Sequence, residues 1–264
     1  PWTLKVFIGP VIDSFTISRF GRRRFWVLIS QLMMILALLP LVFIEVLEVN
    51  WVMISLLTLH NTFVAISDIA IDALAADSLK EDQLAKANGF MWGSKTLGRG
   101  LGMALATSVF YAYGVNEGFA ILICTMSLIL LLPILSKELN HKAGHEAQPY
   151  KNRLTFKELV LGIRQSMFNP SAVAAIIFML FANIGYGIFD VIYNEFYINE
   201  LGWNGEEIGH MRPYGMWLGG LIGLSAGLMT LYFRKRSLLL FFVIGQAVVF
   251  LSLIHISEPT RHRL

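Results

Sequence analysis

The sequence is poor in cysteine and in charge. Its single cysteine, Cys124, lies inside an apolar run, so a disulfide framework is excluded. Only 15% of the 264 residues are charged and 56% are hydrophobic. A soluble domain has about 25% charged and about 45–50% apolar residues. This balance excludes an ordinary soluble domain and indicates a polytopic membrane protein.

Signatures of enzymes and ATP-driven pumps are also missing. There is no glycine-rich phosphate loop, so ATP-driven transport is not expected. No His/Cys/Glu cluster has metal-ligand spacing, and the lone HEAQ at His145 lies in a hydrophilic connection. No Ser–His–Asp set occurs either. We therefore expect no cofactor, no metal and no enzyme activity. A membrane-embedded transferase and a channel are the alternatives to a transporter.

Charge-poor segments of about 18–25 residues recur along the chain, which is the length that a helix needs to cross a bilayer core of roughly 30 Å. They are too long for barrel strands, and lipid requires each backbone group to find an internal partner. We therefore expect an all-α membrane protein. The predicted spans are 1–12, 25–44, 51–74, 87–112, 118–135, 171–193, 207–232 and 237–250.

Among the connections between these spans, only alternate ones contain lysine or arginine. The connections that contain them are 13–24, 75–86, 136–170 and 233–236, and those without them are 45–50, 113–117 and 194–206. The positive-inside rule places the first set in the cytoplasm. The net charge of +3 is therefore explained by the basic connections on one side of the membrane, and nucleic acid is not an expected partner.

Ionisable side chains inside a membrane cost several kcal/mol, so each is a candidate functional residue. Asp68 and Asp72 are four residues apart on one helical face, and so are Lys95 and Arg99. Asp68 and Lys95 lie at similar depth, so we expect an ion pair, for which a purely structural role is the alternative. We hypothesise that Asp68 or Asp72 takes up a proton, because desolvation favours the neutral acid and a nearby cation favours the carboxylate.

The intramembrane cations outnumber the aspartates. They are Lys5, Lys95, Arg99 and Arg212, against Asp68, Asp72 and Asp190. A surplus of cations suits an anionic solute, and the deepest cation, Arg99, is the first candidate for a substrate contact. Arg212 and Asp190 both lie toward the outer face, where they are expected to pair with each other.

Glycines recur at four-residue spacing on two of the predicted helices. They are Gly89 and Gly93, Gly98 and Gly102, and the longer row Gly215, Gly219, Gly223 and Gly227. Small-residue faces let helices approach closely in lipid. We interpret these faces as static packing or, alternatively, as a sliding contact between two moving halves.

Every third predicted helix is free of charge, a nested repeat of the kind found in major facilitator transporters. The stretch GPVIDS followed by GRRR resembles the loop motif of that superfamily. The matching residues are Gly9, Asp13, Gly21, Arg22 and Arg23, with Arg24 extending the basic run. This resemblance implies two six-helix halves, and it implies that Asp13 latches onto the other half at the cytoplasmic side.

A closer resemblance is to the AmpG-type muropeptide permeases and the related acetyl-coenzyme A transporters. It is carried by WTLKVFIGPVID, FGRRRFWVLISQ, SDIAIDALAADSL and LGWNGEEIG. The resemblance implies a proton-coupled secondary transporter for an anionic solute such as a muropeptide, with acetyl-coenzyme A or another organic anion as the alternative. It further implies a monomer in the lipid bilayer of a bacterial inner membrane, coupled to a proton or another cation.

The resemblance also predicts how the chain is divided. We expect helices two to six of twelve over 1–135, a cytoplasmic connection between the halves over 136–170, and helices seven to nine over 171–250. The first helix and the last three would then be missing from this sequence.

The segment LSLIHISEPTR, from Leu251 to Arg261, resembles translated sequencing-adapter sequence. We therefore predict that 251–264 does not belong to the natural protein, because such scars are read as coding sequence when a gene is assembled. Raw sequencing reads that cross Phe250 should contain adapter bases after it. Reads that continue into the same codons without adapter bases would overturn this prediction.

Overall fold

In the computed structural model, the chain is described over residues 5–14, 23–44, 50–135, 161–162, 165 and 168–257. Over these residues the chain is helical and contains no strand, which confirms the predicted all-α class. Most of the expected connection at 136–170, and the tail after Ser257, lie outside the described residues. The proposed division into two halves therefore stays a prediction.

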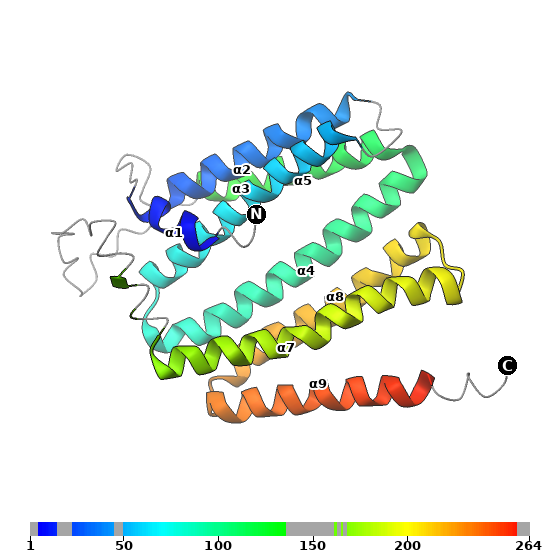
Figure 1. Ribbon diagram of the computed structural model, residues 1–264. Helices are drawn as coiled ribbons and strands as arrows, with labels where there is room; N and C mark the ends of the chain where they lie inside the picture. The colour runs from blue at the N-terminus through cyan, green and yellow to red at the C-terminus, as the bar shows by residue number, and fades with distance from the viewer. Residues whose placement is uncertain are drawn as a thin grey trace.

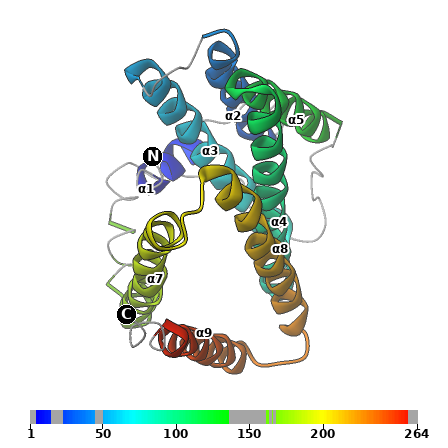
Figure 2. The same ribbon diagram turned by 90° about the vertical axis from the view of Figure 1, so that its right-hand side faces the viewer.

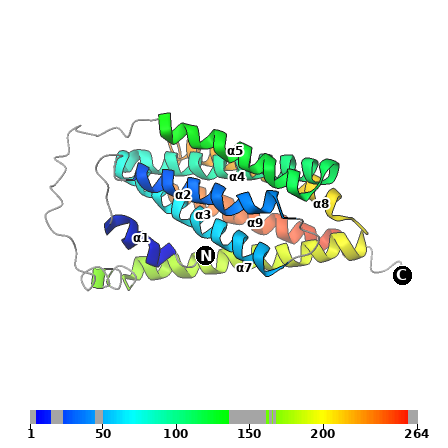
Figure 3. The same ribbon diagram turned by 90° about the horizontal axis from the view of Figure 1, so that it is seen from above.

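The long helices run side by side along one direction (Figures 1 and 3). In chain order they are α1 (Lys5–Ser14), α2 (Arg24–Leu38) with a 3-10 turn η2 (Leu39–Val42), α3 (Trp51–Ser78), α4 (Glu81–Tyr113), α5 (Val115–Leu135), α7 (Pro170–Glu195) with a π-helical turn η3 (Phe196–Glu200), α8 (Gly205–Met229) and α9 (Lys235–Ser257).

Asparagine caps explain where three of these helices begin. The side chain of Asn50 accepts a hydrogen bond from Met53 N at 2.9 Å, and Asn169 caps α7 in the same way. At α8 a capping box forms. The side-chain oxygen Oδ1 of Asn204 accepts a hydrogen bond from Glu207 N, and the Glu207 carboxylate accepts one from Asn204 N. Each cap satisfies backbone donors that the first helical turn leaves unpaired.

Two helices differ most from their predicted spans. α4 begins at Glu81, so it reaches further into the charged connection than the expected 87–112. α9 continues past Phe250 to Ser257, because apolar residues such as Leu251 extend the preceding run. Among the described residues, four helical segments are long and apolar enough to cross a bilayer: Arg24–Val42, Trp51–Ser78, Val115–Leu135 and Lys235–Ser252.

The ends of the bundle differ in charge. α2, α4, α7 and α9 begin at the end where α3, α5 and α8 finish (Figure 1). The described basic residues at this end are Arg23, Arg24, Lys80, Lys86, Arg234, Lys235 and Arg236, whereas the opposite end carries Glu117, Glu195, Glu200, Glu206 and Glu207. The folded chain thus gathers its terminal positive charge on one side, as the alternation of connections predicts.

The most extensive helix contact joins α4 to α8, which run antiparallel (Figure 2). A methyl group on Gly89 would lie 2.3 Å from Gly227 Cα, and one on Gly220 would lie 2.6 Å from Leu97 Cγ. Toward the other end of the contact, a methyl group on Gly209 would lie 2.6 Å from Thr107 Cγ2. The missing side chains are what allow the two backbones to approach this closely.

The predicted glycine face was partly wrong. Gly223 and Gly227 lie in the contact, but Gly98, Gly102 and Gly215 would have nothing within 4 Å of an added methyl group, and Gly219 would meet only Thr96 at 3.9 Å. A row at four-residue spacing turns by about 40° at each step around an α-helix. The row that starts at Gly227 therefore rotates out of the interface, and the contact continues through Gly220 instead.

Gly89 and Gly98 both lie on α4, one inside the contact with α8 and one outside it, so they give a matched test of that contact. We predict that Gly89→Ala destabilises the protein by about 1–3 kcal/mol, because the new methyl group overlaps backbone atoms of α8. Gly98→Ala should be neutral or slightly stabilising, since alanine favours a helix and the site is open. Thermal unfolding in detergent measures both, and equal effects of the two substitutions would contradict the contact.

Candidate functional site

Asp68 on α3 forms ion pairs with two lysines that come from two other helices. Its Oδ2 contacts Lys5 of α1, and its Oδ1 contacts Lys95 of α4. The Asp68 side chain is 10% exposed, so the carboxylate is largely removed from solvent. A buried carboxylate is retained only when it is paired, and here a single carboxylate joins three helices.

Asp72 lies one helical turn further along α3 and is held much less tightly. Lys95 Nζ lies 3.8 Å from Asp72 Oδ1, which is longer than a hydrogen bond. Its side chain is 54% exposed, and among the described residues this is its single ion-pair contact. Lys95 is therefore shared between one tightly bound aspartate and one loosely bound aspartate.

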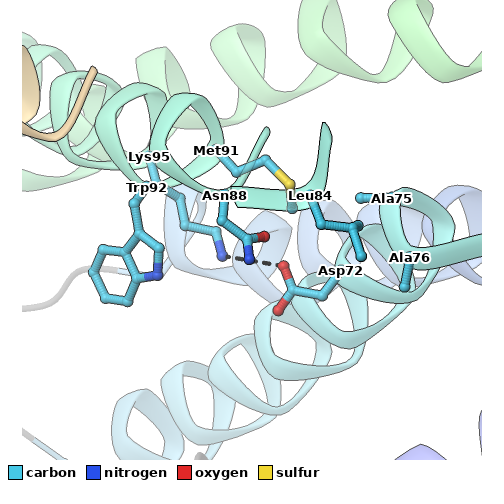
Figure 4. Close-up of a pocket in the computed structure, with 8 residues that line it drawn as sticks. All are labelled: Asp72, Ala75, Ala76, Leu84, Asn88, Met91, Trp92 and Lys95. Atoms are coloured by element: carbon cyan, nitrogen blue, oxygen red, sulfur yellow. Dashed lines mark ion pairs between the residues drawn. The ribbon is translucent and has the colours of Figure 1, made fainter. Parts of the chain in front are cut away.

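A cavity of about 420 Å³ lies between α3 and α4 beside this shared lysine. Figure 4 shows Lys95 and Asp72 pointing toward each other, with Asn88 next to them. Trp92 lies on the other side of Lys95, whose Nζ is 5.9 Å from the ring centroid. The remaining lining is apolar and consists of Ala75, Ala76, Leu84 and Met91. The cavity thus combines a charged pair with apolar walls.

Arg99, the first candidate for a substrate contact, is not part of this cavity lining. It is exposed and lies one turn beyond Lys95 on the same face of α4. Within the described part of the chain, its side chain makes no ion pair with any residue. The structure therefore places it beside the site, and its contact with a substrate stays a prediction.

Asp190 and Arg212 form an ion pair between α7 and α8, as their positions in the sequence predict. Arg212 Nη2 donates to Asp190 Oδ1 at 2.6 Å, and the two side chains are 45% and 30% exposed for Asp190 and Arg212. Tyr193, one turn along α7, donates its hydroxyl to Met211 Sδ at 3.2 Å. This pair is separate from the site around Asp68, because it connects other helices.

The arginines of the loop motif bind helix ends near the start of α2. The buried Arg23 donates from Nε to Asp77 Oδ2 at 2.8 Å, which ties α2 to the end of α3. Arg24 donates to the carbonyl oxygens of Pro133 and Ile134, and so caps the end of α5. A cation is favourable at a helix C-terminus, where the last carbonyls have no helical partner.

Other residues of the motif are placed less fully. Gly9 lies in α1 with open space around it, since an added methyl group would meet nothing within 4 Å. Asp13 also lies in α1, but its side chain is outside the described residues, and so are Gly21 and Arg22. The latch expected at Asp13 therefore stays a prediction.

Three of these contacts were missed from the sequence. Lys5 was not expected to bind Asp68, and neither Asp77 nor the α5 carbonyls were expected to bind the arginines. Pro133 near the end of α5 was a usable signal, because a proline favours the end of a helix, and the last carbonyls of a helix need partners from outside it. Among the described residues, no group of three or more His, Cys, Asp or Glu side chains is placed to hold a metal.

Comparison with known proteins gives a family and several relatives for the chain. A family model described as the Major Facilitator Superfamily matches residues 2–262. The chain is 26% identical over 242 residues to a Rickettsia felis protein named "Putative transporter AmpG 4", with 88% of this chain and 56% of the relative covered. A Rickettsia conorii protein of the same name is 25% identical, again over 88% of this chain and 56% of the relative.

A Haemophilus influenzae protein named "Uncharacterized protein" is 23% identical, over 94% of this chain and 59% of the relative. The chain thus spans little more than half the length of these curated relatives. No solved structure matches the chain.

The carboxylates of Asp68 and Asp190 differ in burial, so we predict that an Asp→Asn substitution lowers the free energy of unfolding by different amounts at the two sites. Asp68→Asn removes a carboxylate that is only 10% exposed and that pairs with two lysines, and should lower the free energy of unfolding by about 3–5 kcal/mol. Asp190→Asn removes an exposed pair and should cost about 0.2–1 kcal/mol. Thermal unfolding of both variants in detergent checks this order, and a larger effect at Asp190 would contradict it.

Proposed function

Because the chain belongs to the major facilitator superfamily of transporters, we propose that it is a secondary active transporter that moves an anionic solute together with a proton. The site is the charge cluster of Lys5, Asp68, Asp72 and Lys95 with the adjoining cavity. The sharing of Lys95 between two unequal aspartates is the observation that carries this proposal.

Lys95 is suited to bind an anion because it has a weak partner that a solute can replace. Its contact with Asp72 is long and faces the cavity, so an anionic oxygen of a solute can take the place of that carboxylate. Its contact with Asp68 keeps the ammonium positioned while this exchange takes place. Arg99, one turn further along α4, then offers a second cation to a larger solute.

A muropeptide is the solute that we propose first. Two relatives carry the name of an AmpG transporter, and the sequence resembles the muropeptide permeases. Acetyl-coenzyme A or another organic anion is the second candidate. Both classes present carboxylates or phosphates, which lysine and arginine bind through charge-assisted hydrogen bonds.

The proposed setting is the cytoplasmic membrane of a bacterium. The relatives are bacterial, and the basic end of the bundle is assigned to the cytoplasm by the positive-inside rule. In this orientation the cavity lies toward the cytoplasmic ends of α3 and α4. We propose that the protein acts as a monomer and that Asp13 contributes to closing this side.

Uptake by the full-length protein tests the proposal, with one lysine substitution and a matched control on the same helix. Lys95→Gln should lower the uptake of a labelled anhydromuropeptide by at least about tenfold, because one charge-assisted contact is worth about 1.5–3 kcal/mol. Lys86→Gln should leave uptake near the wild-type level, since Lys86 lies over the Phe90 ring outside the cluster.

The wild-type result separates the two solutes. Uptake of anhydromuropeptide supports the first candidate, whereas uptake of labelled acetyl-coenzyme A alone supports the second. Equal loss in both lysine variants would contradict the assignment of the site. A solute recovered in chemically altered form would favour a membrane-embedded transferase instead.

A further inference from the structure

The two aspartates of the cluster have different geometries, and this difference separates their roles. We propose that Asp72 alone exchanges the coupled proton, that Asp68 stays ionised throughout, and that the site takes up one proton for each negative charge bound at Lys95. This inference rests on the proposed function and deepens it, because it names the proton-carrying residue and the charge balance of transport.

Asp68 is held in its ionised form by contacts on both oxygens. Lys5 occupies Oδ2 and Lys95 occupies Oδ1, in a site where the side chain is 10% exposed. Protonation would take the shared carboxylate away from two ammonium groups at once, and a charge that loses its partner beside a largely buried carboxyl group is costly. It would also release the link between α1, α3 and α4. Asp68 is therefore a fixed bridge.

Asp72 has the opposite properties. It lines the cavity, is 54% exposed, and lies 3.8 Å from the one ammonium near it. Protonation of this residue breaks one weak contact and leaves the bridge between Lys5, Asp68 and Lys95 intact. Asn88 lines the same cavity (Figure 4), so an uncharged polar group is also present there. Asp72 can therefore gain and lose a proton without disturbing the bridge.

The charged groups around Asp72 are few. Lys95 comes from α4, Lys5 from α1, and Asp68 from the preceding turn of α3. α2 packs extensively on α3, and its one charged residue, Arg24, is engaged at the end of α5. Arg99 lies a turn beyond Lys95, outside the cavity lining. Among the described residues two lysines thus face two aspartates, and this set of four is neutral when all are ionised.

The neutral charge of the cluster determines how many protons are taken up when a solute binds. Binding a single negative charge to a neutral cluster that is only partly open to solvent is unfavourable, because an unbalanced charge that is withdrawn from water is costly. A proton that moves from water onto an Asp72 oxygen releases Lys95 from Asp72, while Lys95 keeps its contact with Asp68. The cluster then has one positive charge, which the anionic oxygen of the solute cancels. When the solute leaves, the proton returns to water and Lys95 contacts the Asp72 carboxylate again.

Infrared difference spectroscopy of the purified protein in lipid tests this without any solute. A pH titration should show one carboxylic-acid carbonyl band from the cluster, which is lost completely in Asp72→Asn. Asp190→Asn, the same substitution at the other membrane pair, should leave that band unchanged. Loss of the band in Asp68→Asn but not in Asp72→Asn would overturn the inference, and so would its presence in both.

Transport in proteoliposomes gives the second readout, with a labelled anhydromuropeptide that carries one carboxylate as the probe. A pH gradient should drive accumulation, whereas a membrane potential alone should drive none. Asp72→Asn should lose accumulation but still exchange labelled for unlabelled solute. Accumulation driven by the potential alone would contradict the charge balance. If the wild type does not move the probe, the proposed solute fails, and the infrared titration still decides the role of Asp72.

Discussion

The structure depends on one constraint, which is that an ionised group inside a membrane must be compensated where it lies. Asp68 satisfies this constraint by recruiting lysines from α1 and α4, and so it joins helices that are far apart in the sequence. α3 and α4 otherwise contact each other sparingly. The ion pair is therefore a principal link between them as well as the centre of the proposed site.

α4 brings the site and the widest helix interface onto adjoining faces. Lys95 points to α3, while Gly93 and Leu97, two residues to either side, contact Gly220 of α8. A change at the lysine therefore lies within one helical turn of the tightest backbone approach between α4 and α8. If the proposed solute binds at Lys95, it therefore binds next to the contact between the two proposed halves.

Much of this architecture follows from local sequence. Apolar run length predicts the helices, the alternation of Lys and Arg predicts which connections share an end, and depth along the helix predicts the pairing of Asp68 with Lys95. Contacts between residues that are far apart in the sequence are harder to predict. Lys5 reaches Asp68 only because of how α1 packs on α3, and Arg24 finds α5 carbonyls more than a hundred residues away. The glycine face was misjudged because a four-residue row drifts around the helix, and only the partner helix decides where contact continues.

The central claim is that Asp68 and Lys95 hold α3 and α4 together through direct interaction. A double-mutant cycle on unfolding in detergent, with Asp68→Asn, Lys95→Gln and the combined variant, measures that interaction. We expect a coupling free energy of about 1–3 kcal/mol, with the combined variant more stable than the sum of the single losses implies. Losses that simply add would show that the two residues act independently, and would contradict the claim.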